Sequence, residues 1–129
     1  MPQLVNIMDY NDICEKVMGC DTKIKDVYIV NNEAHLLAFN GAGEMDKISE
    51  AQLAEILEDL LFIIGSRKHH ENVFGRLEYV HIKHKDAETI VFPFEKDKVL
   101  CICMKDHSFN ETEIVSKLKQ KMLGLYRYA

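Results

Sequence analysis

The stretch from Ser49 to Lys68, SEAQLAEILEDLLFIIGSRK, gives the clearest secondary-structure signal in the chain. Ser49 stands three residues before Gln52, a capping-box arrangement that satisfies amide protons left unpaired in the first helical turn. Arg67 and Lys68 end the stretch, where cations suit the helix dipole. Apolar residues recur at intervals of three and four, which places them on one helical face: Leu53, Ile56, Leu57, Leu60 and Ile64. The stretch is therefore predicted to be a helix with one buried face.

The apolar surface of this helix is wider than one face requires. At about 100° per residue, Ala54, Leu61 and Gly65 fall beside the main stripe and widen it to about half of the circumference. Phe62 and Ala51 lie further round, among acidic residues. One interpretation is a deeply buried helix with a stray exposed aromatic residue. The other is a helix that covers its own sheet and also meets a second molecule, with Ala54 and Gly65 allowing another helix to approach closely.

Length and composition indicate one domain over residues 1–129, of ordinary globular character. The chain has 29% charged and 47% apolar residues, near the averages for soluble domains. Its formal charge of -5, with no basic face, argues against a nucleic-acid partner. The longest apolar run, Leu60–Ile64, is too short to cross a bilayer, and the first residues do not resemble a signal peptide. We therefore expect a cytoplasmic protein without membrane insertion.

The segments on either side of the helix alternate between strand and helix signals. A capped helix from Asp9 to Met18 precedes a hairpin whose turn is Asn31–Ala34, and Asn40–Gly43 forms a flexible exit from that hairpin. A polar loop, His69–Asn72, follows the central helix and ends at Gly75. The predicted strands are Val27–Val30, His35–Phe39, Leu77–Lys85, Thr89–Phe94 and Val99–Met104.

A last helix starts at Asn110, with an inner face made by Ile114, Val115, Leu118, Met122 and Leu125. The element order is thus α-β-β-α-β-β-β-α, an α/β fold in the α+β sense, with one five-stranded antiparallel sheet sandwiched by helices. Val99–Met104 is apolar throughout, which predicts a central strand, whereas the polar-interrupted Leu77–Lys85 lies nearer an edge. Pro93 cannot donate to a ladder, so it belongs near a strand end.

No constellation of side chains predicts catalysis, a bound cofactor or a metal. Cys101 and Cys103 share a face of the most apolar strand, where a free cysteine behaves as a small hydrophobic residue. The adjacent His69 and His70 diverge on a loop without a fixed third ligand. The segment Gly41–Gly43 lacks the Lys-Ser/Thr and the glycine spacing of nucleotide-binding loops. We therefore predict no enzyme activity and no resident cofactor or metal.

The order and length of these elements resemble the roadblock/dynein-light-chain superfamily, over about Asp9 to Leu125. The first hairpin, Val27–Ala38, pairs two short apolar strands around a polar turn, as in that superfamily. Leu77–Ile82 and Thr89–Phe94 look like its third and fourth strands. The whole is similar to small stand-alone roadblock-like proteins of archaea, although the hairpin turn lacks the glycine often found in the family. The resemblance implies a roadblock- or profilin-like fold.

The same resemblance implies a non-enzymatic homodimer that serves as a platform for small Ras-like GTPases. Family members dimerise through their third strands and second helices, which implies a dimer interface of Ala54, Glu58, Leu61, Gly65, Leu77, Tyr79, His81 and Lys83. His81 is a candidate for tuning that interface through protonation near neutral pH. Ala51, Glu55 and Phe62 are the candidates for the partner surface. The alternatives are a small-ligand sensor of profilin- or PAS-like layout and a structural subunit of a larger complex.

Overall fold

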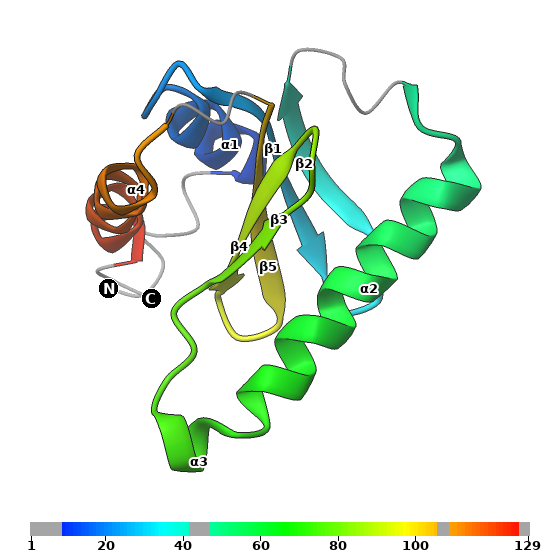
Figure 1. Cartoon of the computed structure of the whole chain (residues 1–129), viewed down its shortest axis with the longest axis vertical. Coiled ribbons are helices and arrows are strands. Elements are labelled where there is room, and N and C mark those ends of the chain that lie inside the picture. The colour runs from blue at the N-terminus through cyan, green and yellow to red at the C-terminus, as the bar shows by residue number, and fades with distance from the viewer. Residues whose placement is uncertain (1–8, 42–46, 106–108, 127–129) are drawn as a thin grey trace.

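The computed structural model describes residues 9–41, 47–105 and 109–126, and it places one five-stranded antiparallel sheet between helices (Figure 1). The spatial order of the strands is β2-β1-β5-β4-β3. This confirms the predicted element order and fold class, with one short helix added. The elements are α1 (Tyr10–Met18), β1 (Ile24–Asn31), β2 (Leu36–Gly41), α2 (Glu50–Lys68), α3 (Glu71–Phe74), β3 (Val80–Lys83), β4 (Glu88–Phe94), β5 (Lys98–Met104) and α4 (Glu111–Tyr126).

The position of each strand follows its hydrophobic pattern. The apolar β5 lies between β1 and β4, and five of its seven residues are buried. The short β3 pairs with β4 alone and forms one edge of the sheet, as the polar interruptions predicted. Pro93 pairs with Val99 one residue before the end of β4, where its missing amide proton interrupts the ladder least.

The predicted helix caps are present. The hydroxyl of Ser49 accepts a hydrogen bond from the amide of Gln52 at 3.1 Å, and the Asp9 carboxylate accepts one from the amide of Asp12 at 2.8 Å. The side chain of Asn110 caps α4 in the same way, by accepting from the amide of Glu113. Each cap satisfies a donor that the first helical turn cannot use internally, which fixes where these helices begin.

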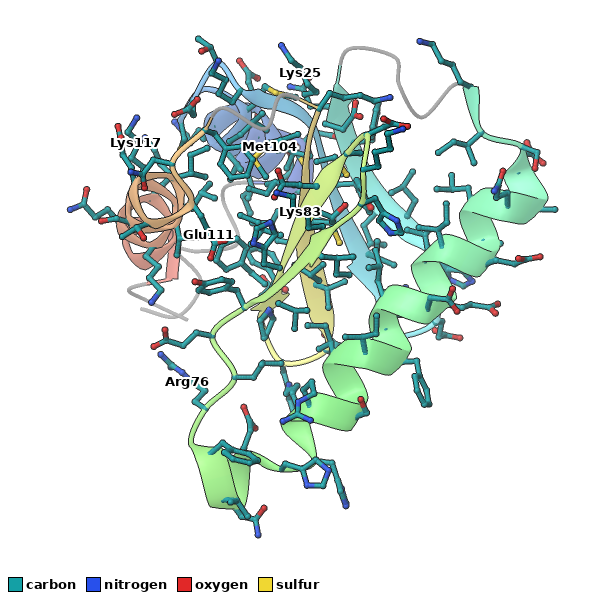
Figure 2. All side chains as sticks on the ribbon, viewed as in Figure 1. Lys25, Arg76, Lys83, Met104, Glu111 and Lys117 are labelled. Carbon is teal, nitrogen blue, oxygen red and sulfur yellow. The ribbon has the colours of Figure 1, made fainter. Side chains whose placement is uncertain are left out.

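Side chains fill the space on both sides of the sheet, but the two sides are covered unequally (Figure 2). The helices α1 and α4 cover one side, and we call the apolar side chains beneath them the two-helix layer (Figure 1). Of the described helices only α2 covers the other side, and we call the apolar side chains beneath it the one-helix layer. Among the described residues, the two-helix layer has 16 buried and 6 partly buried members. The one-helix layer has 8 buried and 9 partly buried members, so its cover is incomplete.

Two local expectations differ from the structure, and two others fall partly on residues outside its described part. The predicted polar loop after α2 contains α3, which ends at Gly75 with φ 86°, a conformation that glycine adopts most readily. The predicted strand Leu77–Lys85 is hydrogen-bonded only over Val80–Lys83. Residues 42 and 43 of the predicted flexible exit lie outside the described part, as do the side chains of Met122 and Leu125 on the predicted α4 face. The rest of that face, including Leu118, is buried.

The turn between β1 and β2 provides a stability test. Asn31 braces it by accepting hydrogen bonds from the amides of Glu33 and His35, each at 2.9 Å, and Ala34 takes the left-handed conformation with φ 64°. Because a Cβ atom is unfavourable there, Ala34→Gly is expected to raise the free energy of unfolding by about 0.5–1 kcal/mol in urea titration. Ala38→Gly, in the buried part of β2, is the matched control and should lower it. A destabilised Ala34→Gly variant would contradict this description of the turn.

Candidate interaction surface

The outward face of α2 holds the residues predicted to meet a partner. Ala51, Glu55 and Phe62 are all exposed, and the Phe62 side chain is 76% exposed. The capped first turn and the buried stripe of Leu57, Leu60 and Ile64 fix the rotation of the helix, which turns Phe62 away from the sheet. An isolated exposed apolar residue is ordinary, but an aromatic ring held on a rigid helix is a suitable anchor for a protein contact.

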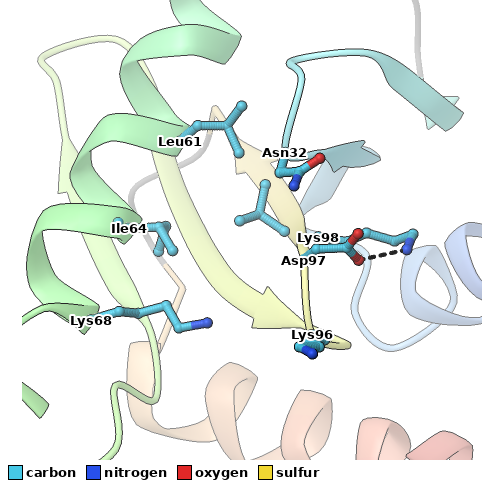
Figure 3. Close-up of a pocket in the computed structure, with 9 residues that line it drawn as sticks. Asn32, Leu61, Ile64, Lys68, Lys96, Asp97 and Lys98 are labelled. Atoms are coloured by element: carbon cyan, nitrogen blue, oxygen red, sulfur yellow. Dashed lines mark hydrogen bonds and ion pairs between the residues drawn. The ribbon is translucent and has the colours of Figure 1, made fainter.

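One flank of α2 forms the wall of a pocket. Leu61 and Gly65 line it together with Asn32, which follows β1, and Val99 of β5 (Figure 3). The pocket has a volume of about 280 Å³, and lysine side chains also line it. Asn32 lies in the turn between β1 and β2, which are on the far side of the central strand β5 from the β3 edge, so this flank faces away from β3.

The opposite flank of α2 carries Ile56, Ile63 and Arg67, whose spacing of seven and four residues puts them on one side of the helix. The guanidinium carbon of Arg67 lies 5.8 Å from the centre of the Phe74 ring, in the segment that leads into β3. Ile63 is partly exposed and belongs to neither apolar layer. This flank therefore faces the β3 side of the molecule and keeps apolar surface uncovered.

The residues around β3 point to alternate sides of the sheet. Val80 and Ile82 pack in the one-helix layer, and so does Leu77, whereas Tyr79 packs in the two-helix layer. Lys83 is exposed at the end of the strand. Among the described strands β3 pairs only with β4, so no described strand satisfies the backbone donors and acceptors on its other edge.

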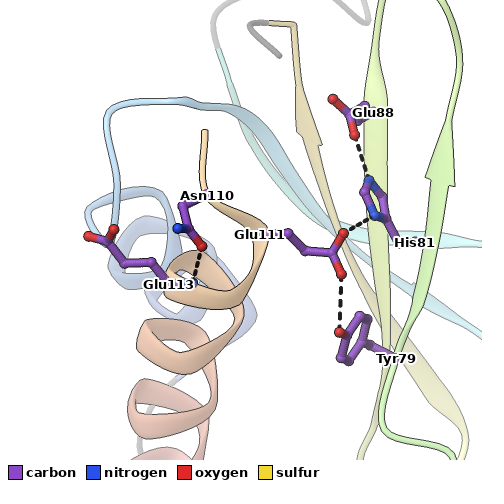
Figure 4. Close-up of polar contacts among 6 residues, drawn as sticks. All are labelled: Tyr79, His81, Glu88, Asn110, Glu111 and Glu113. Carbon is purple, nitrogen blue, oxygen red and sulfur yellow. Dashed lines mark hydrogen bonds and ion pairs between the residues drawn. The ribbon is translucent and has the colours of Figure 1, made fainter. Parts of the chain in front are cut away.

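The side chains of Tyr79 and His81 are engaged within the subunit (Figure 4). Nε2 of His81 lies 2.7 Å from Oε1 of the buried Glu88 on β4, and Nδ1 contacts Oε1 of Glu111 on α4. The Tyr79 hydroxyl donates to Oε2 of Glu111 at 3.2 Å. A neutral imidazole donates from only one nitrogen, so both contacts are donated hydrogen bonds only when the ring is charged. This network joins the start of α4 to the edge strand.

The structure thus separates the residues predicted for the dimer interface. Leu61 and Gly65, with the exposed Ala54 and Glu58 on the same flank, lie on the pocket side of α2. Of the residues predicted from the third strand, His81 and Lys83 lie in the edge strand β3, and Leu77 and Tyr79 lie in the segment just before it. Sequence spacing correctly places each set on one element, but it does not give the direction in which α2 crosses the sheet. The His81–Glu111 contact, between residues 30 positions apart, has no signal in the sequence.

The cysteines occupy apolar sites. Cys101 and Cys103 share the one-helix layer, as their spacing predicted, and Cys14 is buried in the two-helix layer. Burial raises the pKa of all three thiols, that of Cys14 to about 12, so they stay protonated and weakly nucleophilic. Within the described ranges, no group of three or more His, Cys, Asp or Glu side chains is arranged to hold a metal ion.

These buried thiols predict alkaline destabilisation. In the unfolded chain a thiol ionises near pH 8.5, whereas folded Cys14 keeps its proton up to a pKa of about 12. The free energy of unfolding should therefore fall as the pH rises above about 8.5, by about 1.4 kcal/mol per pH unit for each such thiol. In urea titrations at several alkaline pH values, Cys14→Ala should make this slope shallower by that amount. An unchanged slope would show that Cys14 ionises alike in both states.

None of the helices in the described residues is long and apolar enough to cross a membrane. Comparison of the sequence with protein-family models and with curated proteins finds no match.

Solved structures, by contrast, match this chain over most of its length. MglB of Myxococcus xanthus matches with a TM-score of 0.70 at 12% identity, over 91% of this chain and 91% of that chain. A roadblock/LC7 domain from Streptomyces avermitilis matches with a TM-score of 0.70 at 6% identity, over 94% and 98%. For profilin II of Acanthamoeba castellanii the TM-score is 0.56 at 12% identity, over 92% and 98%. At these identities the likeness is one of fold, and this chain has the fold seen in the MglB and roadblock/LC7 domain structures.

Proposed function

We propose that this protein is a non-enzymatic adaptor that forms a homodimer and presents its sheet-and-helix surface to a small Ras-like GTPase. The observation that carries the proposal is the unequal cover of the sheet. A single helix lies over the one-helix layer, and more of that layer's members are partly exposed than buried. When another protein covers such exposed apolar surface, the association gains about 25 cal/mol of free energy for each Å² removed from water.

The dimer is proposed to form through the β3 edge and the flank of α2 nearest to it. Edge pairing would satisfy the free backbone groups of Val80–Lys83 and extend the sheet into a second copy. Ile56 and Ile63 on the same side would then be covered by the α2 helix of that copy. Among the residues predicted from sequence, Leu77 and Lys83 fit this arrangement best, because Tyr79 and His81 are engaged with Glu111.

The outward face of α2 is proposed as the GTPase contact. There Phe62 is an exposed aromatic anchor, and the acidic Glu55, Glu58 and Asp59 on the same helix are exposed as well. This combination suits a partner that offers an apolar socket with a basic rim. Two facts support the proposal: the sequence resembles a superfamily of GTPase platforms, and the fold matches roadblock structures, one of which is described as MglB with a tetrameric arrangement.

Affinity capture tests this function. The immobilised protein is exposed to the native proteome with either GDP or a non-hydrolysable GTP analogue. We expect recovery of a small GTPase that depends on which nucleotide is present, and loss of that recovery with Phe62→Ser. Because Phe62 is 76% exposed, this substitution should leave the fold intact, which a thermal melt verifies. Leu36→Ser, an exposed apolar change on β2, is the matched control. Capture that ignores the nucleotide and recovers no GTPase would end the proposal.

The pocket beside α2 favours one alternative, a small-ligand sensor. Its volume of about 280 Å³ is near the lower end of ligand sites, and Leu61, Ile64 and Val99 give it apolar walls. A thermal-shift screen against metabolites tests this function. A saturable rise in melting temperature that Gly65→Leu abolishes would favour the sensor over the adaptor.

A further inference from the structure

Residues 67–76, RKHHENVFGR, form the end of the molecule where α2 ends and α3 turns the chain toward β3 (Figure 1). We call this segment the α3 tip. Its two apolar side chains are adjacent and exposed, with Val73 at 69% and Phe74 at 74%. Only Phe62 is as exposed among the large apolar residues that the structure describes. Two such side chains side by side on a projecting turn mark a contact surface.

The tip is basic in an otherwise acidic protein. Arg67, Lys68 and Arg76 are its cations, and Arg76 lies beside α3 in Figure 2. Glu71 is its only acid, and that carboxylate is already used, because Oε2 accepts a hydrogen bond from the amide of Leu77 at 2.7 Å. With histidines neutral, the tip has a net charge of +2, whereas the whole chain has -5. The charge of the tip is therefore opposite in sign to that of the rest of the molecule.

The tip is also a fixed structure. The amides of Val73 and Phe74 both donate to the carbonyl oxygen of His70, at 3.0 and 3.1 Å, and the amide of Gly75 donates to that of Glu71 at 2.9 Å. Arg67 lies over the Phe74 ring, with 5.8 Å between the guanidinium carbon and the ring centre. The apolar pair is thus presented in one orientation, so little conformational entropy is lost when it binds.

We propose that the α3 tip docks the protein on an anionic membrane surface. Val73 and Phe74 enter the region beneath the headgroups, and Arg67, Lys68 and Arg76 pair with acidic headgroups around them. A bilayer with acidic lipids offers this combination, an anionic layer directly above an apolar one. A protein partner would instead need an acidic groove deep enough to enclose this projecting turn. The contact is peripheral and differs from a membrane span, for which no described helix is suitable.

Vesicle binding with a built-in fluorescent reporter tests the proposal. The chain has no tryptophan, so Phe74→Trp creates a single emitter at the tip and Phe62→Trp creates a matched one on the outward face of α2. Adding phosphatidylcholine vesicles that contain phosphatidylserine should shift the emission of Phe74→Trp to shorter wavelength and leave that of Phe62→Trp unchanged. Pure phosphatidylcholine vesicles should shift neither, and raised salt should weaken the effect because it screens the headgroups.

Sedimentation with the same vesicles gives the affinity. Val73→Ser with Phe74→Ser should lower the partition coefficient at least about tenfold, from the apolar surface lost. Arg76→Gln should lower it about fivefold, which is the contribution of one basic side chain near an anionic surface. Phe62→Ser should bind the vesicles as well as the unsubstituted protein does. Since the same variant is expected to lose GTPase capture, failure of one proposal can be told from failure of the other. The proposal is overturned if the unsubstituted protein does not bind anionic vesicles, or if the tip variants bind them as well as it does. It is also overturned if the tip variants keep their vesicle binding and lose only the binding of an acidic protein.

Discussion

Ile63→Asp is expected to convert the proposed dimer into a monomer and to raise its dissociation constant at least about 100-fold. Ile63 lies on the α2 flank that faces β3, and it is partly exposed and outside both apolar layers. In the dimer, the aspartate would be an unpaired charge removed from water, which costs about 3 kcal/mol or more. In the isolated subunit the same side chain reaches solvent, so the fold should persist. Sedimentation equilibrium over a concentration series measures the change.

Leu61→Asp is the matched control, because it places the same charge two residues away on the pocket flank of α2. It should leave the dissociation constant within about threefold, the range expected for a substitution outside an interface. If Leu61→Asp dissociates the dimer and Ile63→Asp does not, the helices pair through the Ala54–Gly65 flank that the sequence indicated. The assignment to the β3 side would then be wrong.

Leu118→Ala is expected to lower the free energy of unfolding by about 3–4 kcal/mol. Leu118 is fully buried in α4, in the layer that two helices cover. Leu118 has no exposed surface, so its truncation leaves an enclosed cavity into which the close-packed neighbours relax only in part. Urea unfolding followed by circular dichroism gives the value.

The matched change on the other side is Leu53→Ala in α2, which removes the same atoms from a partly exposed position in the one-helix layer. It should cost about 1–2 kcal/mol, because part of the removed surface was already in contact with water. Equal costs for the two variants would show that both layers are equally well covered. The basis for proposing a partner over α2 would then be lost.

The fold was largely predictable because its signals are local. The cap at Ser49, the buried stripe through Leu57, Leu60 and Ile64, and the fully apolar run of β5 each depend on residues close in sequence. Periodicity also gave the correct sides for Cys101 and Cys103, which point to the same layer. These patterns hold because helices lie over both faces of the sheet, so its central strands are apolar on both sides.

The features that the sequence did not predict depend on contacts between residues far apart in the chain, or on which of several possible hydrogen bonds forms within a short segment. The left-handed residue of the first hairpin is Ala34, although two asparagines precede it, because Asn31 is used as the hydrogen-bond acceptor that braces the turn. The helix α3 forms within a segment that reads as a polar loop, and it is stabilised by the Glu71 carboxylate bonded to the amide of Leu77. The contact of His81 with Glu111 requires the tertiary structure.

In the candidate interaction surface, too, the sequence predicted the local features and missed those that depend on the tertiary structure. Sequence spacing identified Phe62 as the outward residue of α2, and its exposure in the structure agrees. Spacing alone could not relate the two flanks of α2 to the two edges of the sheet, because a helical wheel contains no information on what lies beside the helix. The pocket contacts of Leu61 and the position of Arg67 over Phe74 supply that relation.

Light scattering of the purified protein, from low micromolar to several hundred micromolar, tests the central claim that a second copy covers the exposed flank of α2 and the β3 edge. We expect the mass to approach twice the 14.9 kDa of the chain as concentration rises. A mass that stays at 14.9 kDa across the whole series would contradict it.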